Sequence, residues 1–165
     1  MIDTILQTLA DSSIGTRIAA DATLFPWIEV AHVLAVTTVF GSILLVDLRL
    51  TGLAGRDYPV MALSRSIVPV TWVAFLFAVL TGGLLFASNP FTYFGNSFFR
   101  IKILLLFGAG LNMAIFHFWT MRTARDWDKS LHIPAPARAA GWLSILIWIG
   151  VIACGRWIGF TMAPF

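Results

Sequence analysis

Several side chains that could do chemistry lie inside long apolar runs of this sequence. Glu29 and His32 are three residues apart, so they share one face of a helix. Lys102 lies near the start of the third apolar run, and Arg156 lies inside the fourth. An ionisable side chain at membrane depth costs about 2.5–3.5 kcal/mol on insertion scales, so such residues need partners or a function. These positions are therefore the first candidates for a functional site.

The composition of the chain explains why these charges are unusual. Its 165 residues are 59% hydrophobic and 12% charged, and the mean hydropathy is +0.87. In lipid every backbone polar group must be bonded within the protein, so long apolar runs cross the bilayer as helices. The sequence therefore predicts an all-α membrane protein, a bundle of four transmembrane helices at residues 24–46, 66–88, 98–121 and 139–162. The lipid bilayer is the first expected partner, and the net charge of +3 does not indicate nucleic-acid binding.

Residues 1–22 form a separate N-terminal segment, which leaves 23–165 as the transmembrane domain. Asp3 and Asp11 lie in this segment without a preceding basic cluster, which is not typical of a cleavable signal peptide. Apolar residues recur partly at helical spacing: Ile2, Ile5, Leu6, Leu9 and Ile18. The pattern predicts an amphipathic segment that lies in the membrane interface.

Basic residues predict how the helices are oriented, because connections rich in Lys and Arg stay in the cytoplasm. The connection between the first two helices carries three arginines, Arg49, Arg56 and Arg65. The connection between the last two carries Arg122, Arg125, Lys129 and Arg138. We therefore expect a multi-pass protein of a bacterial inner membrane, with both termini outside, in the periplasm. The connection at residues 123–138 is expected to be an ordinary solvated loop.

The helical rise of about 1.5 Å per residue separates the candidate side chains into two layers. His32 lies roughly 10 Å from the outer edge and His117 roughly 25 Å from it, so one metal ion cannot bind both. The remaining ionisable residues fall in the same outer leaflet as His32, with Arg156 close to the level of Glu29. We expect an outer-leaflet cluster of Glu29, His32, Arg100, Lys102 and Arg156, rimmed by Trp27, Phe94, Phe98 and Trp157.

This outer cluster predicts binding of a b-type haem or a quinone. A neutral imidazole such as that of His32 is a common axial ligand of haem iron, and the three cations would pair with propionates or position a head group. The tryptophans of the rim would suit a porphyrin edge or a quinone ring. In the alternative interpretation Glu29 pairs with Arg156, His32 bonds to a neighbouring helix, and the cluster binds nothing.

Two further patterns suggest other roles. Met113, His117 and Met121 are spaced four residues apart, which would stack two thioethers and an imidazole on one helical face. Soft ligands of this kind suit Cu(I), so copper is a further candidate cofactor. Gly155 and Gly159 have the spacing of small residues that lets a neighbouring helix approach closely, within the chain or in a dimer.

Three stretches carry a resemblance to a known family. AHVLAVTTVFGSILLVDLRLTGL, NMAIFH and GWLSILIWIGVIACGRWIGF together resemble an uncharacterised family of small bacterial four-helix membrane proteins. More remotely, the arrangement is similar to copper-resistance D-type membrane proteins and to cytochrome b561-like proteins. The remote similarity rests on helix number and on a histidine near the start of the first helix.

The sequence leaves three hypotheses for function. The first is a small redox subunit that passes electrons to or from a membrane or periplasmic protein partner. The second is a non-catalytic anchor or assembly subunit, in a larger complex or a homo-oligomer, and the third is a copper-handling membrane protein. No nucleophile and base pair, phosphate loop or nucleotide fingerprint is present, so we do not expect a stand-alone enzyme of the hydrolase or NAD class.

Overall fold

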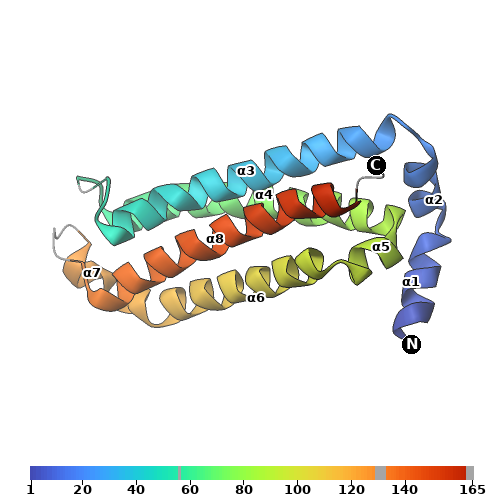
Figure 1. The fold of residues 1–165 in the computed structure, drawn as a ribbon. Coiled ribbons are helices and arrows are strands. Elements are labelled where there is room, and N and C mark those ends of the chain that lie inside the picture. The colour runs from blue at the N-terminus through green and yellow to red at the C-terminus, as the bar shows by residue number, and fades with distance from the viewer. Residues whose placement is uncertain (56, 129–132, 163–165) are drawn as a thin grey trace.

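The computed structural model describes residues 1–55, 57–128 and 133–162 (Figure 1). Four long helices lie side by side: α3 (Leu24–Thr51), α4 (Val60–Ser88), α6 (Ser97–Phe118) and α8 (Ala135–Met162). All four are long and apolar enough to cross a membrane. The predicted four-helix bundle is therefore confirmed, and the chain is a multi-pass membrane protein.

Three of the helices, α3, α4 and α8, extend beyond the predicted apolar runs at the end of the bundle where α7 (Ala124–Trp127) lies. The helix α3 continues past residue 46 and ends before Gly52, whose left-handed φ of 78° is typical of a helix C-terminus. The helices α4 and α8 begin at Val60 and Ala135, before the predicted starts at 66 and 139. Hydropathy did not detect the extra turns of α3, because several of the side chains that they bury are polar or charged, namely Asp47, Arg49 and Thr51.

The helices pack in the order α4, α3, α8, α6. Each neighbouring pair in this order makes extensive contact, whereas the backbones of α4 and α6 approach each other at few points, so side chains join these two helices. Large apolar side chains such as Leu104 and Phe107 of α6 are 70% and 75% exposed. An outer surface of this kind suits hydrocarbon rather than water.

Two short helices, α1 (Ile2–Ala10) and α2 (Ser13–Ala20), lie across the end of the bundle opposite α7 (Figure 1). Leu6 and Ile18 are buried, whereas Ile2 is more than half exposed. Gly15 packs tightly on α4, since a Cβ there would lie 2.5 Å from the carbonyl oxygen of Ala87. The N-terminal segment is thus helical and amphipathic, and its place in the membrane interface stays a prediction.

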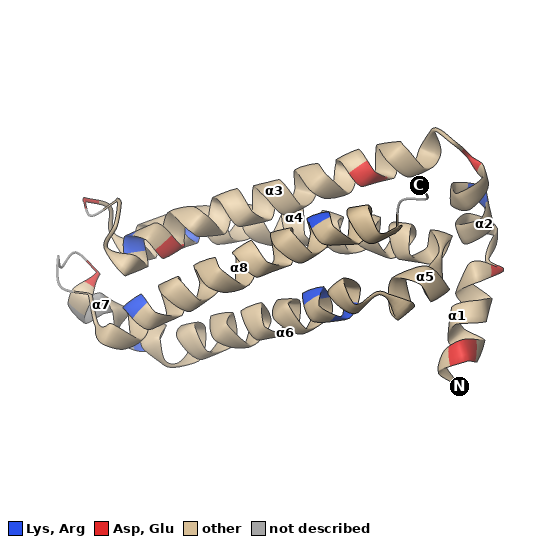
Figure 2. Ribbon diagram, in the orientation of Figure 1, with Lys and Arg blue, Asp and Glu red and all other residues tan. Residues whose placement is uncertain are grey.

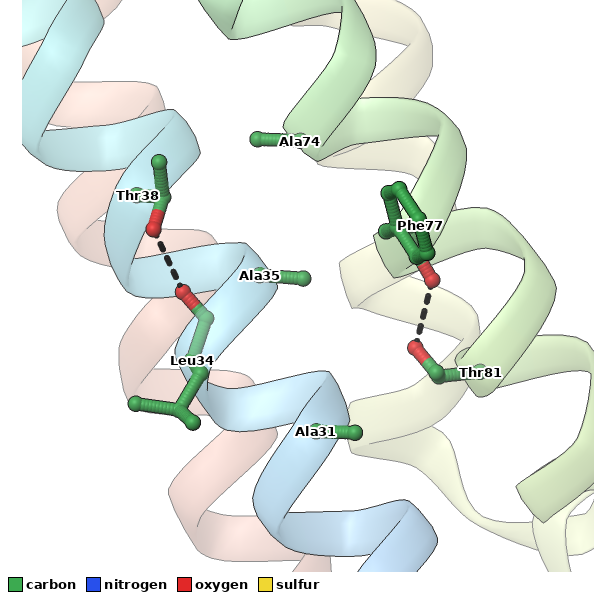
Figure 3. Close-up of a pocket in the computed structure, with 7 residues that line it drawn as sticks. All are labelled: Ala31, Leu34, Ala35, Thr38, Ala74, Phe77 and Thr81. Atoms are coloured by element: carbon green, nitrogen blue, oxygen red, sulfur yellow. Dashed lines mark hydrogen bonds between the residues drawn. The ribbon is translucent and has the colours of Figure 1, made fainter.

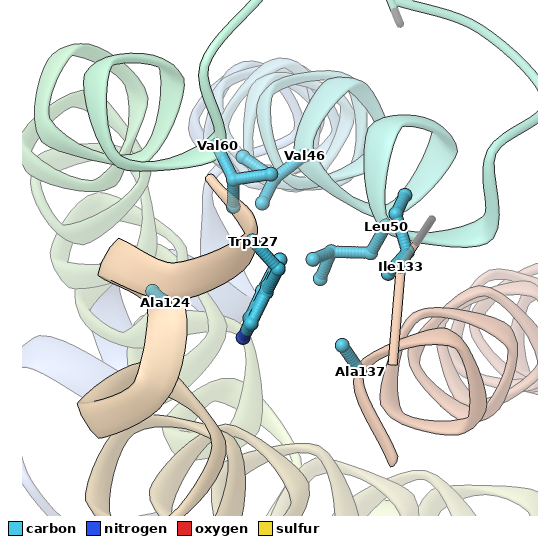
Figure 4. Close-up of a cluster of buried hydrophobic side chains, with 7 residues drawn as sticks. All are labelled: Val46, Leu50, Val60, Ala124, Trp127, Ile133 and Ala137. Atoms are coloured by element: carbon cyan, nitrogen blue, oxygen red, sulfur yellow. The ribbon is translucent and has the colours of Figure 1, made fainter. Parts of the chain in front are cut away.

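A buried apolar cluster closes the α7 end of the bundle (Figure 4). Its members are Val46, Leu50, Val60, Ala124, Trp127, Ile133 and Ala137. The expectation of an ordinary solvated loop at residues 123–138 is wrong for the described part of that connection. The 3-10 helix η1 (Thr120–Thr123) and α7 fold back onto the bundle, and Trp127 is only 6% exposed. His132 lies outside the described residues.

The side chain of Arg49 joins the α3–α4 connection to the turn that follows α7. Its side chain is 1% exposed. Its Nε donates to the carbonyl oxygen of Tyr58 at 2.8 Å, and its Nη2 donates to that of Asp128 at 3.3 Å. The Asp128 carboxylate in turn accepts from the backbone N–H of Met61 at 2.7 Å. One guanidinium therefore holds the α3–α4 connection and the turn after α7 together.

Candidate functional site: a histidine and a lysine inside the bundle

His32 contacts side chains from two other helices. Its Nδ1 is 3.1 Å from Oγ1 of Thr81 on α4. Its Nε2 is 3.4 Å from Nζ of Lys102 on α6. Both His32 and Lys102 are partly buried. Since the backbones of α4 and α6 approach each other at few points, this imidazole is one of the side chains that join the two helices.

The Thr81 hydroxyl determines which nitrogen of His32 carries the proton. That hydroxyl donates to the carbonyl oxygen of Phe77 at 2.6 Å, so its oxygen is left to accept from the imidazole. Nδ1 of His32 must then be the protonated nitrogen, as assigned from this hydrogen-bond network. The lone pair of Nε2 consequently points toward Nζ of Lys102, which donates to it.

Two glycines face these side chains, and one of them leaves room that a larger residue would fill. A Cβ at Gly82 would lie 2.9 Å from Cε1 of His32, closer than real Cβ contacts. A Cβ at Gly155 would lie 3.6 Å from Nζ of Lys102, an ordinary contact distance. Gly155 thus faces the Lys102 side chain, whereas a Cβ at Gly159 would have no described atom of the chain within 4 Å.

An aromatic group lies one helical turn before Lys102. Phe86 of α4 stacks on Phe99 of α6, with ring centroids 5.3 Å and planes 13° apart. Tyr93 of α5 (Pro90–Gly95) contacts both rings, at 6.2 and 5.7 Å. Burial raises the pKa of Tyr93, and the negative charge of Glu29 raises it further. The phenol therefore stays neutral and forms a wall of apolar character.

The structure does not bring the other predicted polar residues to the imidazole. Glu29, Arg100 and Arg156 are exposed. Arg100 donates to Oγ of Ser97 at 3.3 Å, and the Arg156 guanidinium lies 4.4 Å from the centroid of the Phe160 ring. The alternative pairing of Glu29 with Arg156 is therefore absent from this structure, whereas the expected bond from His32 to a neighbouring helix is present.

The two predicted tryptophans are also separate from His32. Trp27 is 72% exposed and precedes His32 by five residues, so it lies roughly 140° around α3 from it. Trp157 is 54% exposed and packs against Phe98, with ring centroids 5.7 Å apart. Neither indole lines the histidine–lysine site, because helical rotation directs Trp27 elsewhere and Trp157 contacts its own aromatic neighbours.

The expected methionine and histidine stripe is interrupted. The helix α6 ends at Phe118, so Met121 belongs to η1 and packs against the buried cluster at the α7 end. His117 is exposed, and Met113 is partly buried. Within the described part of the chain no three His, Cys, Asp or Glu side chains form a group that could hold a metal ion. Copper binding stays a prediction, without the continuous stripe on which it was based.

Three residues of the bundle interior were not among the predicted site residues. Thr81 and Gly82 belong to a Thr-Gly-Gly sequence in an apolar helix, and small and hydroxyl residues there are a signal for close packing. Asp47 is the third, only 5% exposed, and it lies beside Ser144 of α8. Its Oδ2 has no hydrogen-bond partner among the described residues.

The fold and the site together define a four-helix membrane protein with a histidine–lysine pair inside the bundle. Residues 14–161 match the model of a family of unknown function, DUF6644. The match covers most of the chain, so the protein belongs to this family, and the expected membership of an uncharacterised family is confirmed. Neither a curated protein nor a solved structure matches the chain.

Proposed function

We propose that the protein is a small membrane redox subunit that binds haem b through Nε2 of His32. The observation that carries this proposal is the hydrogen bond between His32 and Thr81. A histidine that ligates a metal commonly donates its other ring N–H to a fixed acceptor, which sets the tautomer and the ring orientation. His32 meets this requirement with a lone pair on Nε2 directed into the bundle.

Lys102 supports the same proposal because it places a cation beside the ligand nitrogen. An ammonium group can pair with a carboxylate such as a haem propionate. Binding at Nε2 requires Nζ of Lys102 to move, and the flexible four-carbon stem of lysine permits this. The remote similarity to b561-like cytochromes is in accord with a haem protein. His32 and His117 differ in depth along the bundle by roughly 15 Å, so only one of them would bind the iron.

A quinone is the second candidate for the same site. Lys102 and His32 are polar groups within largely apolar surroundings, and a lysine ammonium can donate to a quinone carbonyl oxygen. The neighbouring rings of Phe86 and Phe99 suit a planar ligand. Both candidates lead to the same role, exchange of electrons with a partner protein.

Absorption spectra of the purified protein, oxidised and dithionite-reduced, test this proposal. We expect a Soret band that His32→Ala abolishes and that Lys102→Met weakens, because the first removes the ligand and the second removes its neighbouring cation. His117→Ala is the control and should leave the spectrum unchanged. Organic extraction of the same samples detects a quinone. If neither haem nor quinone is found, the redox proposal is wrong and the anchor or assembly hypothesis remains, for which the open surface at Gly159 offers a contact.

We further propose that the α7 end faces the cytoplasm and that α1 and α2 face the periplasm of a bacterial inner membrane. The connections at the α7 end carry most of the Lys and Arg of the chain, whereas acidic residues lie at both ends of the bundle (Figure 2). The variant Ser13→Cys, in a Cys154→Ser background, should react with a membrane-impermeant maleimide added to intact spheroplasts. The variant Arg65→Cys, in the same background, should react only after lysis. The reverse pattern would contradict this orientation.

A further inference from the structure

A groove runs along the outer surface between α3 and α4 (Figure 3). It consists of two adjoining cavities of about 340 and 360 Å³, which share Thr38 and Ala74 in their linings. Ala31 and Ala35 on α3 and Ala74 on α4 present small side chains to it. Along α4 the lining extends from Thr81 to Pro69, a distance of roughly 18 Å.

The groove offers almost nothing polar to an occupant. Its two hydroxyls donate to carbonyl oxygens of their own helices, Thr38 to Leu34 at 2.8 Å and Thr81 to Phe77 at 2.6 Å (Figure 3). The other lining side chains are apolar. An α-helix is about 10 Å wide and would lie over such a groove rather than in it. The dimensions and the chemistry suit a single hydrocarbon chain.

Trp27 indicates where this chain would enter. It precedes Ala31 by four residues, so it lies on the groove face of α3, near the α2 end of the bundle. Its exposed indole is the kind of side chain that favours the depth of lipid head groups. We propose that the groove is a lipid-binding site that holds one acyl chain of a membrane phospholipid, with the head group beside Trp27.

Filling the groove tests this proposal independently of the redox site. Ala31 and Thr38 are exposed, so the double variant Ala31→Leu, Thr38→Leu fills the groove without forcing α3 and α4 apart. Ala153 on α8 is also exposed and lies outside the groove, so Ala153→Leu is the matched control. Each delipidated protein is titrated with dioleoylphosphatidylglycerol, and bound lipid is counted by native mass spectrometry. We expect the double variant to bind dioleoylphosphatidylglycerol about tenfold more weakly than the wild type, and the control to bind it as the wild type does.

Three outcomes distinguish a lipid site from a contact between chains and from the redox site. Equal lipid binding by the wild-type protein and the groove variant would overturn the proposal. A wild-type dimer that the groove variant converts to monomer would assign the groove to a second copy of the chain, which also overturns it. His32→Ala should bind the lipid as the wild type does, so the failure of the redox proposal would leave this one intact.

Discussion

Replacing Gly82 with alanine is expected to displace the imidazole of His32 and to weaken binding of the proposed haem or quinone about 10–100-fold, the usual cost of losing a group that orients a ligand. The new Cβ would lie 2.9 Å from Cε1 of the ring. The ring must turn, which breaks its 3.1 Å hydrogen bond with Thr81 and redirects Nε2. Cofactor occupancy per chain, from the absorption spectrum or from extracted quinone, measures the effect.

The neighbouring Gly83 provides a matched control. A Cβ at Gly83 would meet no described atom within 4 Å beyond its own helix backbone, so Gly83→Ala should keep full occupancy. Alanine also favours the helix over glycine by roughly 0.5–1 kcal/mol, so the control should be as stable as the wild type or slightly more so. Equal occupancy in the two variants would contradict the assignment of Gly82 as the residue that makes room for His32.

Replacing Arg49 with leucine should destabilise the protein by roughly 3 kcal/mol, since hydrogen bonds to a charged group each contribute about 1.5–3 kcal/mol. The leucine would leave the carbonyl oxygens of Tyr58 and Asp128 without the donors that Arg49 supplies. The connection between α3 and α4 would then be held to the turn after α7 only by the remaining contacts, such as the bond from the Met61 N–H to the Asp128 carboxylate. Thermal unfolding in detergent, monitored by circular dichroism, measures the loss.

Two further variants show whether hydrogen bonds or charge cause this effect. Arg65→Leu removes an exposed arginine from the same end of the bundle and should change the unfolding temperature little. Arg49→Lys keeps the charge but has one nitrogen in place of the Nε and Nη2 donors, so it should recover only part of the stability. Full stability in Arg49→Lys would show that charge alone is needed.

The sequence alone determined the number and class of the spanning elements. A chain in lipid must satisfy its backbone internally, so four long apolar runs become four helices. It also placed His32 and Lys102 in one layer, because the rise per residue fixes depth along each helix. The leaflet in which each residue lies could be predicted from its position along its helix, without any knowledge of packing.

Only the tertiary structure decided which side chains meet within that layer. Helices that are apolar all round give no signal for the face that turns inward, so the sequence could not exclude Arg156 or Trp27 from the site or find Thr81 and Gly82. The same holds for Trp127, whose burial depends on contacts between segments far apart in the chain. Depth is a local property of one helix, whereas rotation and pairing are set by its neighbours. The histidine and lysine that the sequence placed in one leaflet therefore became a contacting pair only through the packing of α3, α4 and α6.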